Sequence, residues 1–213
     1  MVEFEYMDKE KIFKKFGKKD YQVDNETFVM GIHYLLGDHI AHRFKGYNLV
    51  LDACCGAGFM SITLAKYVNQ VVAVELKPEY VALAENNTQI AGVHSKVKFI
   101  GGDILKEDIL NKIPKIDAAF LDPDWAKVGD SKTTHTSKLS DMQPAAEKLF
   151  SEIHKRTQNI ALRLPREIDL SELKTFPPYE LEKIYLDGDF KFYCAYFGQL
   201  IRKIGNTEFS ILS

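Results

Sequence analysis

Short runs of β-branched and other apolar residues alternate with longer amphipathic segments from residue 47 onward. The apolar runs, which we interpret as strands, are residues 48–53, 70–75, 96–101, 116–122 and 159–164. The segments between them have helical spacing, and the expected helices are residues 60–67, 78–91, 104–110 and 143–157. This alternation is typical of a mostly parallel sheet with helices on both faces. The sequence therefore predicts an α/β fold.

The two ends of the chain depart from this alternation. Residues 179–201 contain two strand-like runs joined by Asp187 and Gly188, a pair that favours a tight turn. With this C-terminal β-hairpin we expect a sheet of seven strands. Residues 27–44 are interpreted as one helix packed before the first strand. The predicted division is an N-terminal helical extension over residues 1–45 and one sheet domain over residues 46–213.

Composition argues against several classes of protein. The net charge is −2, so no overall basic field attracts nucleic acid. The three cysteines, two of them adjacent at Cys54 and Cys55, match neither a disulfide framework nor the usual CxxC spacing of a zinc site, and the histidines show no metal-ligand spacing. No metal is expected. The charged N-terminal residues and the lack of a long apolar run predict a cytoplasmic protein without a membrane partner.

A glycine turn, DACCGAG, follows the first expected strand at residues 52–58. Gly56 and Gly58 would let the backbone approach a ligand without a Cβ clash, and the next helix would offer free N–H groups beside it. An acidic residue and a glycine turn at the carboxyl end of the first strand are how class I methyltransferases hold S-adenosylmethionine (SAM). Asp52 is that acidic residue.

Two further acidic residues follow the next two expected strands. Glu75 closes the second strand, where a carboxylate can accept both ribose hydroxyls of a nucleoside. Asp103 follows the third, where it can accept from an adenine amino group while Ile104 packs on the ring. Three acids at successive strand ends favour SAM as cofactor. The expected cofactor-binding residues are Asp52, Ala53, Cys54, Gly56, Gly58, Glu75, Leu76, Asp103 and Ile104.

A dehydrogenase is the main alternative for such a sheet. Its fingerprint would be GxGxxG, whereas this turn reads CCGAGF and lacks the third glycine at its proper spacing. NAD is therefore disfavoured.

The fourth expected strand ends in the sequence FLDPDW. An exocyclic amine on a purine is a weak nucleophile, because its lone pair is delocalised into the ring. Asp122 can accept one amine N–H and the Pro123 carbonyl another, which orients the lone pair toward the methyl donor. Trp125, the only tryptophan, can stack on the base. We expect Asp122, Pro123 and Trp125 to be catalytic, and Trp125 and Asp124 to bind the substrate.

The chain resembles the trimethylguanosine synthase family of RNA cap guanine-N2 methyltransferases. The resemblance rests on stretches in the same order along nearly the whole chain: IFKKF, DHIAHR, LDACCGAG, AVELKPEYVALAENN, FIGGDIL, AAFLDPDW, LPREIDL and AYFGQLIRK. It implies a Rossmann-like class I methyltransferase fold, SAM as donor and guanine N2 as acceptor. It also implies that Arg166, in LPRE, meets phosphate.

The chain departs from this family at several positions. The family usually has SPPW where this chain has DPDW, so Asp122 replaces a serine and Asp124 a proline. Gln22 stands where the cap enzymes carry a phosphate-binding lysine. The chain also lacks the long N-terminal region of the eukaryotic enzymes, so it resembles a compact relative of prokaryotic type.

Together these features predict direct methyl transfer from SAM to an amine, with guanine N2 of RNA or of a cap-like guanosine as the leading acceptor. RNA or a guanine nucleotide is then the partner. Two alternatives remain open: a methyltransferase for another amine, such as adenine N6, a protein or a small molecule, and a non-catalytic RNA-binding subunit with the same fold.

Overall fold

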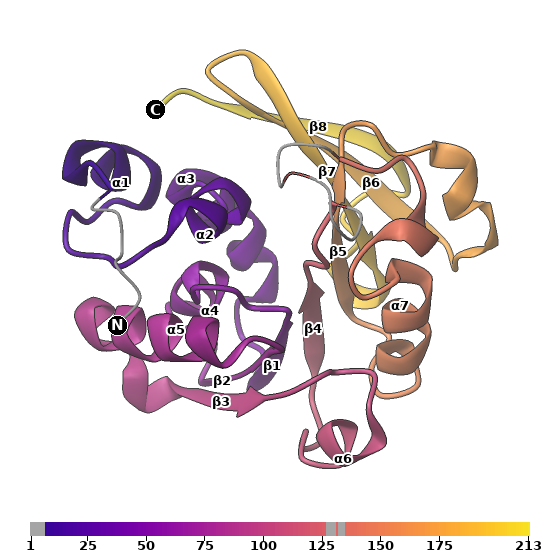
Figure 1. Ribbon diagram of the computed structural model, residues 1–213. Coiled ribbons are helices and arrows are strands. Elements are labelled where there is room, and N and C mark those ends of the chain that lie inside the picture. Colours follow the sequence, from indigo (N-terminus) through magenta and orange to yellow (C-terminus); the bar gives the residue numbers. More distant parts are fainter. Residues whose placement is uncertain (1–6, 127–130, 132–134) are drawn as a thin grey trace.

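A single mixed sheet organises the protein, as shown by a computed structural model that describes residues 7–126, 131 and 135–213. Eight strands in this part of the chain pair in the order β3-β2-β1-β4-β5-β7-β6-β8 (Figure 1). The strands are β1 (Leu49–Ala53), β2 (Gln70–Glu75), β3 (Val97–Gly101), β4 (Ala118–Leu121), β5 (Ile160–Pro165), β6 (Tyr179–Leu186), β7 (Asp189–Phe197) and β8 (Gly205–Ile211).

Strands β1 to β5 run parallel, and their carboxyl ends meet at one edge. Ala53 at the end of β1 pairs with Val74 of β2 on one side and with Leu121 of β4 on the other. The chain order reverses between β1 and β4, and ligands of open α/β sheets bind in the crevice outside the strand ends at such a switch point. This topology places the residues that follow β1, β2, β3 and β4 around one crevice.

Helices cover both faces of the sheet (Figure 1). They are α1 (Lys9–Phe16), α2 (Asn25–Met30), α3 (Tyr34–Ala41), α4 (Phe59–Leu64), α5 (Pro78–Ala91), α6 (Glu107–Leu110) and α7 (Ala146–His154). Alternate strand residues face opposite ways, so Val50 packs in the core under α3 and α4, whereas Leu51 packs in the core under α6 and α7. Helix α1 lies further out, with Ile12 and Phe16 in a third apolar cluster against α4 and α5.

The α/β class, the mostly parallel sheet, the helices on both faces and the hairpin are confirmed, but the expected strand count of seven is wrong. The eighth strand, β8, pairs in parallel with β6 at the sheet edge, where Glu180 faces Gly205. Exposed and half-buried residues alternate along β8. Such an edge strand has no fully buried face. Its sequence therefore lacks the apolar run from which the other strands were predicted.

The expected single helix over residues 27–44 is also wrong. It breaks into α2 and α3 at Gly31, whose extended backbone has φ −61° and ψ 139°. A residue outside the segment contributes to this break. The Phe16 ring of α1 packs so closely against Gly31 that a Cβ there would lie only 2.8 Å from it. His33 then caps α3 by accepting from the Leu35 N–H.

Three other expected helices are shorter than predicted, and one is confirmed. Helix α4 covers Phe59–Leu64, whereas residues 60–67 were expected. Helix α6 begins only at Glu107, because the Asp103 side chain accepts from Leu105 N and forms a turn first. Helix α7 covers Ala146–His154 of the expected residues 143–157. Helix α5 has the expected bounds, with Pro78 in its first turn and Gly92 in the left-handed conformation after its end. The division at residues 45 and 46 stays a prediction.

A buried ion cluster connects the hairpin to the short 3-10 helix His42–Phe44, which lies between α3 and β1. The Arg43 guanidinium donates to Glu180 at 2.8 Å and to Glu182 at 3.0 Å, and all three side chains are at most 5% exposed. Despite burial, the Arg43 partner and other donors lower the pKa of Glu180 to about 2. The strand β7, which adjoins β5, is thereby held in place through its hairpin partner β6. In the described part of the chain, no helix has the length and apolarity needed to cross a bilayer.

Candidate active site

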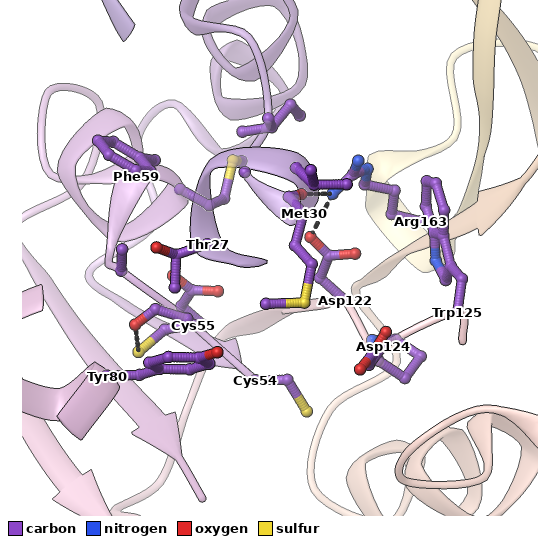
Figure 2. Close-up of a pocket in the computed structure, with 18 of the residues that line it drawn as sticks. Thr27, Met30, Cys54, Cys55, Phe59, Tyr80, Asp122, Asp124, Trp125 and Arg163 are labelled. Atoms are coloured by element: carbon purple, nitrogen blue, oxygen red, sulfur yellow. Dashed lines mark hydrogen bonds and ion pairs between the residues drawn. The ribbon is translucent and has the colours of Figure 1, made fainter. Parts of the chain in front are cut away.

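A large cavity opens at the carboxyl ends of the parallel strands. Its volume is about 1460 Å³, larger than the 300–1000 Å³ usual for one small-molecule site, so it can hold two ligands together. Its lining includes the turns after β1, β2, β3 and β4 and residues of α1, α2 and the α2–α3 junction. Figure 2 shows Thr27 and Tyr80 toward one end and Asp122, Trp125 and Arg163 toward the other.

Asp52 lies at the base of the cavity with an incompletely satisfied carboxylate. The residue is fully buried, and its Oδ2 accepts a 2.5 Å hydrogen bond from Ser61 Oγ. Its Oδ1 has no hydrogen-bond partner among the described residues. Burial raises the pKa of Asp52 to about 7, and the nearby Asp122 and Glu75 carboxylates add to this. A buried acceptor of this kind calls for a donor or a cation in the cavity.

Glu75 fixes the glycine turn from the neighbouring strand. Its Oε2 accepts from Gly56 N at 2.8 Å and its Oε1 accepts from Lys77 N at 3.0 Å. Each carboxylate oxygen has two lone pairs, so both can still accept a hydroxyl from a ligand. Burial raises the pKa of Glu75, while these backbone donors act in the opposite direction.

The two glycines of the turn have different surroundings. Gly56 has φ +52°, lines the cavity, and a Cβ built on it would find no atom within 4 Å. Gly58 has φ +83°, and its Cβ would lie 2.9 Å from the Ala84 Cβ of α5. Gly58 therefore permits helix packing and does not line the cavity, and neither does Ala53, which is fully buried in β1.

The remaining expected cofactor residues line the same end of the cavity. Ile104 is buried, Leu76 is 63% exposed, and Asp103 uses its Oδ1 to accept from Leu105 N at 2.9 Å. Apolar side chains beside a carboxylate suit a flat ring with an amino group. Cys54 also lines this end with a left-handed φ of +65°. Burial and the surrounding carboxylates, Glu75 first among them, raise the pKa of the Cys54 thiol well above its usual value.

Asp122 at the other end is paired with an arginine. Its Oδ2 accepts from Arg163 Nη1 at 2.7 Å, and the same nitrogen donates to the Met30 carbonyl at 3.2 Å (Figure 2). Burial raises the pKa of Asp122, whereas Arg163 lowers it. The Asp122 backbone N–H donates to Ala53 O at 3.2 Å, which ties this motif to the end of β1.

Trp125 and Pro123 lie beside this pair. The Arg163 guanidinium carbon lies 4.3 Å from the Trp125 ring centroid, and Trp125 Nε1 is buried without a partner among the described residues. Asp124 exchanges two 2.9 Å backbone hydrogen bonds with Gln143, which fixes the course of the chain here. No described residue donates to the Pro123 carbonyl. Asp122, Pro123, Asp124 and Trp125 all line the cavity.

Arg166 lies outside the residues that line the cavity. Its side chain is 60% exposed and donates from Nε to Glu167 at 2.7 Å. Its suggested contact with phosphate stays a prediction.

Sequence reasoning missed the contribution of α1, α2 and β5 to this site. Lys15 of α1 donates to the Phe28 carbonyl and, at 3.1 Å, to the Val29 carbonyl, while Arg163 binds the next carbonyl, that of Met30. Burial, with Arg163 and Lys191 nearby, lowers the pKa of Lys15 to about 7. Arg163 is a lone charge within the apolar strand β5, and this pattern could have marked it as a paired buried residue.

Sheet order, glycine turn and strand-end carboxylates together define a class I SAM-dependent methyltransferase. A family model described as RNA cap guanine-N2 methyltransferase matches residues 47–200, and the chain belongs to this family.

Individual relatives agree with this assignment. Trimethylguanosine synthase from Schizosaccharomyces pombe is 33% identical over 169 residues, which are 74% of this chain and 70% of that protein. Among solved structures, a putative methyltransferase from Porphyromonas gingivalis W83 has a TM-score of 0.71 at 18% identity, covering 89% of this chain and 47% of that one. TrmK from M. capricolum, solved with S-adenosylhomocysteine, has a TM-score of 0.56 at 13% identity, covering 83% and 70%. Both structures share the fold.

The cofactor of this methyltransferase is S-adenosyl-L-methionine, and the cavity fits it. The unpartnered Asp52 Oδ1 can receive a donor or a cation, Glu75 can accept the ribose hydroxyls, and Gly56 leaves room where a side chain would intrude. Across the described residues, no three His, Cys, Asp or Glu side chains are grouped to hold a metal ion.

Proposed function

We propose that the chain transfers methyl groups from SAM to the exocyclic N2 amine of guanine in RNA or in a cap-like guanosine. The observation that carries this proposal is the continuity of one cavity from Asp52 and Glu75 to the group Asp122, Pro123 and Trp125. A flat base with an exocyclic amine suits this group, because it offers acceptors for the amine and an aromatic ring for the base. Membership of a guanine-N2 family supports the same acceptor.

Asp122 and Pro123 orient the amine in this proposal. Asp122 gives its Oδ2 to Arg163, and no described residue donates to its Oδ1, so Oδ1 can accept one amine N–H. The Pro123 carbonyl can accept the other, which turns the nitrogen lone pair away from both acceptors. When bound, SAM supplies the electrophilic methyl group. The nitrogen gains positive charge during transfer, and the Asp122 carboxylate stabilises that charge and can receive the released proton.

The test is transfer of radiolabelled methyl from SAM to total RNA, cap analogue and protein extract, followed by nucleoside analysis. The expected product is N2-methylguanosine. Label in 6-methyladenosine or in protein, with none in guanosine, would contradict the proposed acceptor. Absence of turnover by the purified chain that still binds SAM would favour the non-catalytic RNA-binding alternative.

A pair of isosteric variants separates the two ends of the cavity. Asp122→Asn should lower kcat by about 100-fold, because it removes a charge aimed at the reacting nitrogen, and should leave the Kd of SAM within about twofold. Glu75→Gln should instead weaken SAM binding. Equal losses of SAM affinity and turnover in Asp122→Asn would exclude its assignment to the acceptor. Thermal unfolding of each variant controls for loss of structure.

A further inference from the structure

Arg163 is a charge built into the wall of the acceptor end. It lies on β5 between Leu162 and Leu164, both fully buried, and its own side chain is only 8% exposed. Its guanidinium carbon lies 4.3 Å from the Trp125 ring centroid and 4.6 Å from that of Phe192. Figure 2 shows the side chain beside Trp125, with its guanidinium bonded to Asp122 and Met30.

Arg163 already contacts the two groups that would attract a cationic base, the Asp122 carboxylate and the Trp125 ring. A guanine methylated at N7 carries a positive charge, and a site recognises such a base with a carboxylate and with the face of an aromatic ring. Here the Asp122 carboxylate is neutralised by a guanidinium at 2.7 Å. The Trp125 ring already has a cation against it. A base that already carries a charge before methyl transfer would therefore gain less here than from an unpaired carboxylate and a ring face without a cation, while Asp122 Oδ1 still accepts from the reacting amine.

The other charged groups at this end do not reverse that balance. Lys15 lines the cavity, and burial together with the nearby Arg163 and Lys191 charges lowers its pKa to about 7, so it is only partly charged at neutral pH. Lys191 also lines the cavity and pairs with Asp189 at 3.4 Å. Asp124 also lines the cavity, but its Oδ1 accepts from Ala126 N at 3.1 Å. Asp187 and the C-terminal residue Ser213 also line the cavity, so its lysines do not outnumber its carboxylates. The preference between the two forms of the base therefore rests on the contacts of Arg163 with Asp122 and Trp125.

We propose that the acceptor is a guanine that is uncharged at N7, as in ordinary guanosine of RNA, and that Arg163 is the residue that selects against 7-methylguanosine. This inference rests on the proposed guanine-N2 activity. It deepens that activity by naming the chemical form of the base. Guanosine should be preferred over its 7-methyl form by at least about tenfold, the scale of one cation–π contact or one screened charge pair.

The first experiment compares substrates that differ by a single methyl group. Wild-type protein is given a short oligoribonucleotide with one guanosine, unmodified or methylated at N7, and the GpppG and m7GpppG dinucleotides as a second pair. The expected result is a kcat/KM for N2 methylation at least about tenfold higher with the unmodified member. An equal or higher value for the 7-methylated member overturns this inference and leaves the guanine-N2 proposal intact. No N2-methylguanosine from any of the four overturns both.

The second experiment tests Arg163 itself. Arg163→Met frees the Asp122 carboxylate and the Trp125 face, so the ratio of kcat/KM values should move about tenfold toward the 7-methylated substrate. The matched control is Arg156→Met, which removes an exposed arginine outside the cavity and should leave the ratio unchanged. An unchanged ratio in Arg163→Met overturns the assignment.

A binding measurement covers the case in which an unpaired Asp122 prevents folding. The double variant Asp122→Asn/Arg163→Met removes both charges of the pair together. Trp125 is the only tryptophan, so quenching of its fluorescence reports nucleotide binding without turnover. The Kd ratio of m7GpppG to GpppG should be at least about tenfold lower in the double variant than in wild type. Equal ratios in the two proteins overturn the role of Arg163.

Discussion

Replacing each of the two glycines in the turn after β1 by alanine should have different effects on stability and on SAM affinity. Both have left-handed backbones, with φ +52° at Gly56 and +83° at Gly58, so each substitution costs about 1–2 kcal/mol of stability through the backbone. At Gly56 nothing else opposes the new methyl group, which enters open space in the cavity. At Gly58 the methyl group meets the Ala84 Cβ at 2.9 Å, and such overpacking costs about 1–3 kcal/mol more.

The expected free energies of unfolding therefore fall by about 1–2 kcal/mol for Gly56→Ala and by about 2–5 kcal/mol for Gly58→Ala. For SAM affinity we expect the opposite order, with the larger loss in Gly56→Ala. Gly56→Ala places a methyl group where the cofactor approaches the backbone, and its Kd for SAM should rise at least about tenfold, since each 1.4 kcal/mol of lost contact is a factor of ten. The folded fraction of Gly58→Ala should bind SAM with a smaller loss.

Urea unfolding and calorimetric titration with SAM measure the two quantities on each variant. The reasoning is refuted if Gly56→Ala binds SAM like wild type, because the open space beside Gly56 would then not be cofactor space. It is also refuted if Gly58→Ala is no less stable than Gly56→Ala, since the contact with Ala84 would then carry no cost.

Three further predictions concern buried charged groups. Arg43→Leu leaves Glu180 and Glu182 buried without their cation and should lower the free energy of unfolding by about 3–5 kcal/mol, with SAM affinity unchanged. Lys66→Leu, at an exposed ion pair, should cost less than about 1 kcal/mol, and a similar loss in both variants would contradict the importance of burial. Because the folded pKa of Glu180 is about 2, its stabilisation should persist above its unfolded pKa and be lost as pH falls toward 2. Asp52, with a pKa of about 7, is mostly protonated below that pH, so SAM should bind more tightly as pH rises from 6 to 8, with proton release in calorimetry near pH 7. A pH-independent Kd, or the same pH dependence in Asp52→Asn, would show that this carboxylate does not face the cofactor.

Local signals in the sequence predicted the fold where the structure depends on local chemistry. Helix α5 has its predicted bounds because proline starts it and glycine ends it. The predicted helix over residues 27–44 was wrong because Phe16, from a helix earlier in the chain, packs where Gly31 breaks the segment. Strand β8 was missed because it forms by pairing with β6 at the sheet edge, and its sequence carries no apolar run.

In the candidate site, too, some residues follow from local sequence signals and others only from the tertiary packing. Residues at strand ends, such as Asp52, Glu75 and Asp122, were predictable because parallel strands bring their carboxyl ends together. Gly58 was predicted from the same turn, yet its close neighbour belongs to α5, and only the packed structure shows that. The sequence could mark Arg163 as a buried, paired charge, but it could not identify its partners Asp122, Trp125 and Phe192, because they come from distant segments.

The Cys54 thiol lies in the cavity that binds the methyl donor, so its reactivity matters to this protein. SAM is an alkylating agent, and a thiol in the same cavity is a natural target for it. Only the thiolate is a strong nucleophile, and burial together with the carboxylates that serve the ligands holds the pKa of Cys54 well above its usual value. The acidic residues around the cavity thus have a second effect, which is to favour the neutral thiol, the less reactive form of Cys54.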